Sequence, residues 1–244
     1  MTYFFESRES IAEGLGFPLF GISHLCWLAA FVLFAVFSSL VYRRANKSER
    51  IKLRRVFAVL LLLDEAVKVI SLTANGLYFS EYLPFHLCSI NIFLIAWHSI
   101  KPNRALDNFL FIVCIPAAMA ALLTPSWTNL PQWNLMNLHS FTVHILLATY
   151  PIMLLTCGEL NPQLRYLPGS LGLLAVFGVV ALCVNLICGT NFMFLMEPIA
   201  GTPLMWFEEK LGTHLPGFPV LIFAIILVLY GGLYLYRFIA GRLS

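Results

Sequence analysis

The chain has 244 residues, of which 60% are hydrophobic and only 11% are charged. Soluble domains carry roughly 25% charged residues, so this composition cannot cover an ordinary water-exposed surface. A formal net charge of +3 is too small to indicate a nucleic-acid-binding protein. The composition therefore predicts an integral membrane protein, which we expect to reside in the cell membrane.

Long apolar runs follow one another along nearly the whole chain. A helix needs about 20 apolar residues to cross the hydrocarbon core of a membrane. Such runs lie at roughly Phe17–Tyr42, Leu53–Thr73, Leu83–Ile100, Leu106–Thr124, Leu138–Cys157, Tyr166–Cys188 and Phe218–Ala240. We therefore predict an all-α, polytopic membrane protein with about seven transmembrane helices, which form a single domain over residues 1–244.

Basic residues gather in the loops on one side of these predicted helices. They are Arg43, Arg44, Lys47, Arg50, Lys52, Arg54, Arg55, Lys101, Arg104, Arg165, Arg237 and Arg242. Because Lys and Arg accumulate in cytoplasmic loops, we predict that the N-terminus is outside and the C-terminus is cytoplasmic. Topology alone explains the arginine-rich first loop, and binding of anionic lipid is the alternative interpretation.

The six cysteines all lie within or at the ends of apolar runs, so they do not indicate a disulfide framework. They are Cys26, Cys88, Cys114, Cys157, Cys183 and Cys188. Neither a Cys-x-x-Cys nor a His-Glu-x-x-His motif occurs, and the sequence therefore indicates no metal site and no organic cofactor. A cysteine in such a run is usually a small apolar packing group.

Polar side chains inside the predicted helices are costly in a membrane and usually face a cavity or the bundle interior. His24, Cys88, His144 and Asn185 lie on four different helices, each about 5–10 Å below the outer helix end at 1.5 Å per residue. We therefore predict one polar pocket that opens outward. Asn191 lies just beyond the sixth helix and adds a second amide.

The spacing of the remaining ionisable residues predicts their partners. Glu65 and Asp64 are three and four residues before Lys68, so one helix can neutralise its own charges. His86 is about 200° around a helix from Cys88, which predicts that only one of them faces the interior. His139 lies close to the membrane interface, where water can satisfy it.

A thiol beside a histidine from another helix is an arrangement typical of nucleophilic catalysis. The histidine takes the thiol proton, and the thiolate attacks an acyl carbonyl. Spacing alone leaves this pair open, because a Cys and a His on separate apolar helices often meet by chance.

Two sequence motifs carry a family resemblance. The run Leu83–Ser89 (LPFHLCS) is similar to the Leu-Pro-Leu-His-Leu-Cys motif of the YwaF-like family of bacterial integral membrane proteins. The run Gly189–Leu195 (GTNFMFL) resembles the Gly-Ser-Asn-Tyr-Met-Phe-Leu segment of the same family. That family is similar to eukaryotic membrane acyltransferases that remodel ether phospholipids through a Cys and a His. The resemblance implies Cys88 as nucleophile and His144 as its base, with His139 as the alternative histidine.

The favoured interpretation is a bacterial membrane acyltransferase or acyl hydrolase that acts on a membrane lipid or an amphiphilic acyl ester. Asn185 and Asn191 are candidates to bind the oxyanion, His24 to orient His144, and Glu65 to support the site. One rival is a proton-coupled or small-solute transporter, against which the lack of a visible internal repeat counts mildly. The other is a non-catalytic membrane subunit whose polar residues hold helices together.

Overall fold

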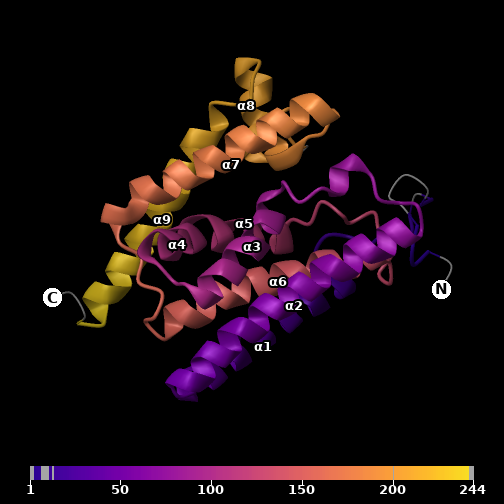
Figure 1. The fold of residues 1–244 in the computed structure, drawn as a ribbon. Helices are drawn as coiled ribbons and strands as arrows, with labels where there is room; N and C mark the ends of the chain where they lie inside the picture. Colours follow the sequence, from indigo (N-terminus) through magenta and orange to yellow (C-terminus); the bar gives the residue numbers. More distant parts are fainter. Residues whose placement is uncertain (1–2, 7–10, 13, 200, 242–244) are drawn as a thin grey trace. The chain divides into compact units, whose positions relative to one another are not determined.

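The computed structural model describes residues 3–6, 11–12, 14–199 and 201–241, and within them every regular element is a helix. The chain divides into two compact units, Met1–Leu171 and Gly172–Ser244, each described below by itself (Figure 1). The prediction of a single domain over residues 1–244 concerns how these units assemble, and it stays a prediction.

Most helices belong to the first unit. They are α1 (Ile22–Arg44), α2 (Lys47–Ala74), the 3-10 turn η1 (Ser80–Tyr82), α3 (Leu87–Ile100), α4 (Arg104–Phe109), the π-helical η2 (Leu110–Cys114), α5 (Ile115–Leu123), α6 (Leu135–Thr156) and the 3-10 turn η3 (Leu164–Tyr166). Helix α7 (Leu167–Cys188) begins in the first unit and continues into the second. The second unit also contains η4 (Phe192–Phe194), α8 (Pro203–Leu211) and α9 (Gly217–Ile239).

Each predicted apolar run coincides with a helical segment. Among the described residues, six segments are both long and apolar enough to cross a membrane. Helix α2 is not one of them, although its 28 residues make it the longest helix. The multi-pass helical fold is thus confirmed, while the count of seven spans and the sides of the two ends stay predictions. Met1 and Ser244 lie outside the described residues.

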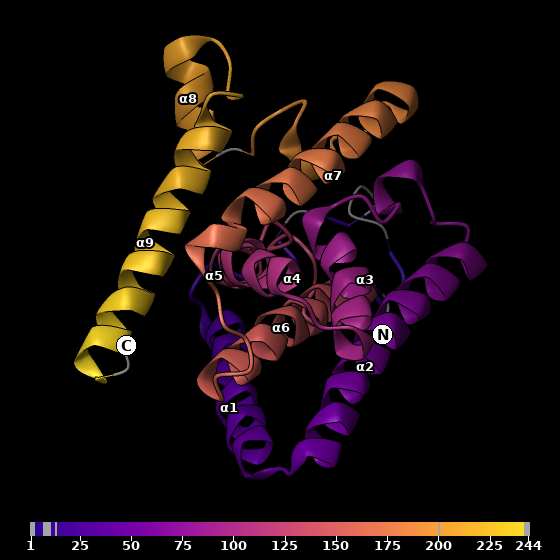
Figure 2. The same cartoon turned by 60° about the vertical axis from the view of Figure 1, so that its left-hand side comes forward.

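Helix α6 is the core of the first unit. It contacts α1, α2, α3 and α5, and in Figure 2 it lies between the two arms of the α1–α2 hairpin. In the most apolar 18-residue stretch of α6, 67% of the residues are buried, against 22% in the corresponding stretch of α1. The polar residues on α6 are therefore enclosed by protein on several sides.

A proline inside α6 explains one contact between neighbouring helices. Pro151 has no N–H to donate to the carbonyl of Leu147, four residues earlier. The Cys114 thiol, from η2, donates to that carbonyl instead at 3.4 Å. Re-satisfying a freed backbone group from a neighbour is what permits proline in a membrane helix.

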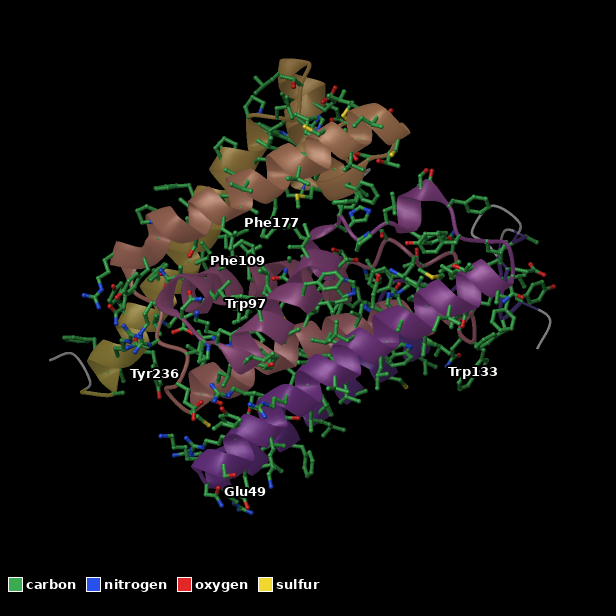
Figure 3. The ribbon with its side chains drawn as sticks, viewed as in Figure 1. Glu49, Trp97, Phe109, Trp133, Phe177 and Tyr236 are labelled. Atoms are coloured by element: carbon green, nitrogen blue, oxygen red, sulfur yellow. The ribbon has the colours of Figure 1, made fainter. Side chains whose placement is uncertain are left out.

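The first unit has two chemically different ends. At one end, Asn46 caps α2 in a reciprocal capping box with Glu49, within the arginine-rich loop. At the other end lies the loop between α5 and α6, which carries Trp133 (Figure 3). We call these the basic end and the tryptophan end.

Candidate functional site

Buried charges from α2 meet the face of α6 inside the first unit. Lys68 Nζ donates to Glu65 Oε1 at 2.6 Å, and both side chains are buried, which confirms the predicted pairing within one helix. Asp64 pairs differently from the prediction. It accepts from Thr142 Oγ1 at 2.9 Å and lies 3.4 Å from Nδ1 of His139.

Satisfaction of His139 by water stays a prediction, but the residue is buried against these carboxylates. The reason is that α6 packs on α2 at this level. His139 Nε2 lies 3.7 Å from Glu65 Oε2, too far for a hydrogen bond. Within the described residues, Glu65 Oε2 and His139 Nδ1 are both buried without a hydrogen-bond partner.

Burial, together with the Glu65 carboxylate, raises the pKa of Tyr78 in the connection after α2.

Cys88 and His86 both lie next to this charged cluster. Helix α3 begins at Leu87, and His86 is its N-cap with extended backbone (ψ 151°). The helical-phase argument that separated His86 from Cys88 is therefore wrong, because His86 is not in the helix. Lys68 acts electrostatically on both residues. Cys88 is partly buried in the first turn of α3, where the positive end of the helix dipole favours negative charge.

His144 is held in a defined orientation on α6. Its Nδ1 donates to the carbonyl of Ser140 at 2.6 Å, and the Trp127 ring stacks on its face at 5.3 Å. With Nδ1 carrying the proton, Nε2 has a free lone pair and no hydrogen-bond partner among the described residues. His139, Asp64 and His86 all act on it electrostatically.

Cys88 and His144 therefore border the same charged cluster but are not in direct contact through a hydrogen bond. None joins the two side chains in the part of the chain that the structure describes. Lys68 and Glu65 act electrostatically on Cys88, and Asp64 and His139 act on His144. A bound molecule would have to lie between the thiol and Nε2 for both to act on it.

Trp127 is a site residue that the sequence did not reveal. An outer-loop tryptophan suggests the aromatic belt at a membrane interface, yet Trp127 is buried over His144 and its Nε1 has no partner. The N-terminal segment holds its loop in place. Phe17 N–H donates to Thr128 O at 2.8 Å, and a Cβ on Gly16 would meet that carbonyl oxygen.

His24 has a structural role that accounts for both of its ring nitrogens. Nδ1 accepts from the N–H of Phe20 at 2.9 Å, and Nε2 donates to the carbonyl of Leu122 at 2.8 Å. Leu122 is in the last turn of α5, where carbonyls have no partner within the helix. His24 thus caps α5 and makes no hydrogen bond to His144. Phe141 packs against its ring and against Trp127.

Asn185 and Asn191 belong to the second unit, where they organise the loop after α7. Asn185 Oδ1 accepts from Phe192 N–H at 2.7 Å, and its Nδ2 donates to the carbonyl of the same residue at 3.0 Å. Asn191 Oδ1 accepts from Met196 N–H at 3.0 Å, and its Nδ2 donates to Glu197 O at 2.9 Å. These bonds give both amides a structural role, and their oxyanion role stays a prediction.

A second polar cluster lies at the basic end, where the sequence predicts no site. His98 Nε2 is 2.9 Å from Asp107 Oδ1, and His98 Nδ1 is 2.8 Å from the Tyr150 hydroxyl, all three side chains being buried. His98 and Asp107 lie near predicted helix ends, where polar groups are expected, whereas Tyr150 lies inside the predicted run Leu138–Cys157. Only the packing of α3, α4 and α6 shows that they meet.

Comparison with known families gives one match. The model of the TMEM164 family matches residues 19–236, which is most of the chain and includes the helices of both units. No curated protein and no solved structure matches the chain.

Proposed function

The chain belongs to the TMEM164 family and is a multi-pass membrane protein, and from this premise we propose that it is a thiol-dependent acyltransferase or acyl hydrolase. Its substrate is a membrane lipid or an amphiphilic acyl ester. Cys88 is the nucleophile and His144 is the base.

One observation carries the proposal: the fixed tautomer of His144. A general base needs an unprotonated nitrogen that the protein does not already use. The hydrogen bond from Nδ1 to Ser140 O leaves Nε2 with that property, and stacking by Trp127 restricts rotation of the ring. His24 and His98, by contrast, use both ring nitrogens within the protein.

The reaction has two balanced steps. His144 Nε2 takes the proton of the Cys88 thiol, and the thiolate attacks the ester carbonyl. The tetrahedral intermediate collapses to a thioester while the imidazolium returns its proton to the departing alcohol. An acceptor alcohol, or water in hydrolysis, then loses its proton to His144 and attacks the thioester. The cysteine sulfur leaves and recovers that proton.

Lys68 supports this chemistry by its charge, and Glu65 by holding Lys68 in place. The Lys68 ammonium is held by Glu65 at 2.6 Å and acts on Cys88 from within a buried, weakly screened environment. A fixed positive charge near the reacting sulfur costs no reorganisation when negative charge develops there. Glu65 acts here as a positioning residue for Lys68.

The experiment is to trap the acyl-enzyme. The full chain in nanodiscs is incubated with a radiolabelled ether phospholipid, the substrate class that the LPFHLCS resemblance implies, and then tested for hydroxylamine-sensitive label. We expect label on the native chain and on Cys183→Ser, an exposed thiol on α7, but not on Cys88→Ser. Label that persists on Cys88→Ser would contradict the proposal.

The unpaired atoms of the α2–α6 cluster favour proton-coupled transport as a second candidate. Glu65 Oε2 and His139 Nδ1 are buried inside two predicted spans and form no hydrogen bond with the described residues, and ionisable residues in such spans often relay protons. In liposomes with a pH-sensitive dye, a Glu65-dependent and solute-dependent proton flux would favour transport. The same flux in Cys88→Ser would separate it from acyl transfer.

A further inference from the structure

The basic end of the first unit contains a pocket of about 500 Å³, lined by residues other than Cys88 and His144. This volume lies in the range of small-molecule sites. Six of its lining residues are polar, namely Arg54, His98, Asn103, Arg104, Asp107 and Glu159. They come from the start of α2, the end of α3, the start of α4 and the segment after α6. We call it the arginine pocket.

The carboxylate oxygens in this pocket already have donors. Asp107 Oδ1 is 2.9 Å from His98 Nε2, and Oδ2 accepts from Arg104 Nη1 at 3.2 Å. Glu159 Oε1 accepts from Arg50 Nη1 at 2.9 Å, and Oε2 accepts from the Tyr42 hydroxyl at 2.6 Å. The anionic groups of the pocket are therefore satisfied by the protein itself.

The guanidinium groups, in contrast, have unused donors. Arg54 forms no hydrogen bond within the described residues, and its Nε is buried without a partner. Its closest ion pair, from Nη1 to Glu159 Oε2, is 3.9 Å long, and its side chain is only 15% exposed. Arg104 uses one hydrogen bond, to Asp107, of the five N–H donors that a guanidinium offers.

We propose that the arginine pocket binds a phosphate group. The carboxylates of this pocket already accept hydrogen bonds, whereas its guanidinium groups have donors to spare. Such a pocket can bind an anion that is rich in acceptor oxygens. Arginine matches phosphate oxygens with paired, charge-assisted hydrogen bonds, and a phosphate has enough oxygens to engage Arg54 and Arg104 together. Leaving a largely buried guanidinium without acceptors is costly, and a bound phosphate removes that cost. Asn103, at the pocket rim, adds a polar side chain.

Two sources could supply this phosphate: the headgroup of a lipid in the adjoining leaflet, or a free phosphate ester. The test uses the full chain purified in dodecyl maltoside, which carries no phosphate. The probes are sn-glycerol 3-phosphate, as a free ester, and dioctanoyl phosphatidic acid, as a lipid with the same group. Binding is measured by thermophoresis, and the unfolding temperature is recorded with each probe, since a ligand that binds the folded state raises it.

We expect saturable binding of the phosphate probes to the native chain. Arg54→Gln and Arg104→Gln should each weaken it at least about tenfold, since one charge-assisted hydrogen bond is worth roughly that much. The Arg104 side chain is 47% exposed, so Arg104→Gln should fold even if Arg54→Gln does not. Arg55→Gln removes the same charge from the exposed neighbour in α2 and should bind within about twofold of native.

The two probes distinguish the source. Much tighter binding of phosphatidic acid identifies a lipid, whereas similar affinities identify a free phosphate ester. The proposal is overturned if neither probe saturates, if Arg104→Gln binds as well as the native chain, or if succinate binds as tightly as glycerol 3-phosphate.

Discussion

At the scale of single residues, Cys88 and His144 are expected to behave as one catalytic unit. His144→Ala should reduce acyl release as far as Cys88→Ser does, and the double variant should be scarcely worse, because members of one unit are non-additive. Initial rates of acyl release in nanodiscs measure this. His139→Ala is the companion variant. A loss there combined with full activity in His144→Ala would move the base to His139.

His24 gives a second expectation, which separates a structural role from a catalytic one. His24→Leu leaves the Leu122 carbonyl and the Phe20 N–H without their partner, and each buried unpaired group costs about 1–3 kcal/mol. We expect a lower unfolding temperature but a normal rate per folded molecule. If His24 orients His144 during turnover, the rate per folded molecule falls instead.

Residue spacing predicted the Glu65–Lys68 contact within one helix, but it failed for Asp64 and for the contacts between helices. The Glu65–Lys68 pair follows from a separation of three residues on one helix, and it forms at 2.6 Å. The contact of His139 with Asp64 depends on how α6 packs against α2, which spacing does not encode. The same reason hid Trp127, whose loop folds back over His144.

At the scale of helices, the contact of η2 with α6 predicts a coupled pair of substitutions. Cys114→Ala removes the donor to the Leu147 carbonyl, so it should cost about 1 kcal/mol more than Cys114→Ser, which keeps a donor. This corrects the sequence-based expectation that Cys114 is only an apolar packing group.

Pro151→Ala provides the matching test, because it restores an N–H in α6 for the same carbonyl. In the Pro151→Ala background, the difference between Cys114→Ala and Cys114→Ser should largely disappear. Chemical unfolding of the four variants in detergent gives the coupling free energy. An unchanged difference between the two backgrounds would show that the thiol does not serve this carbonyl.

The positions of the long helices could be predicted from apolar runs, whereas their first turns could not. The run Leu83–Ile100 was expected to be one helix, but regular α-helix begins only at Leu87. Pro84 keeps Leu83 out of helical backbone, because the residue before a proline avoids it, and the chain is still extended at His86 (ψ 151°). Because α3 begins at Leu87, His86 lies outside the helix, and its orientation does not follow from helical spacing.

At the scale of the whole molecule, the distribution of charge predicts topology. A reporter after Ser244 should be cytoplasmic and one before Met1 external, because the basic residues gather in alternate loops. Protease protection of tagged chains in spheroplasts measures this. Both ends on the same side would mean that an odd number of spans is wrong, with α2 the helix to re-examine.

The charges of α2 also bear on how the protein is made. A translocon releases a segment into lipid according to its apparent free energy of insertion, and Asp or Lys at a helix centre costs roughly 2.5–3.5 kcal/mol there. Lys68 and Glu65 form their ion pair within one helix, so α2 can neutralise these charges before any later helix is synthesised. The double substitution Ala66→Lys and Lys68→Ala moves the lysine by two positions. It keeps the composition of α2 but removes the three-residue spacing between Glu65 and the lysine. Glycosylation mapping in microsomes should then show that a smaller fraction of α2 inserts in the double variant than in the native chain. Equal inserted fractions would mean that α2 inserts only through contacts with later helices.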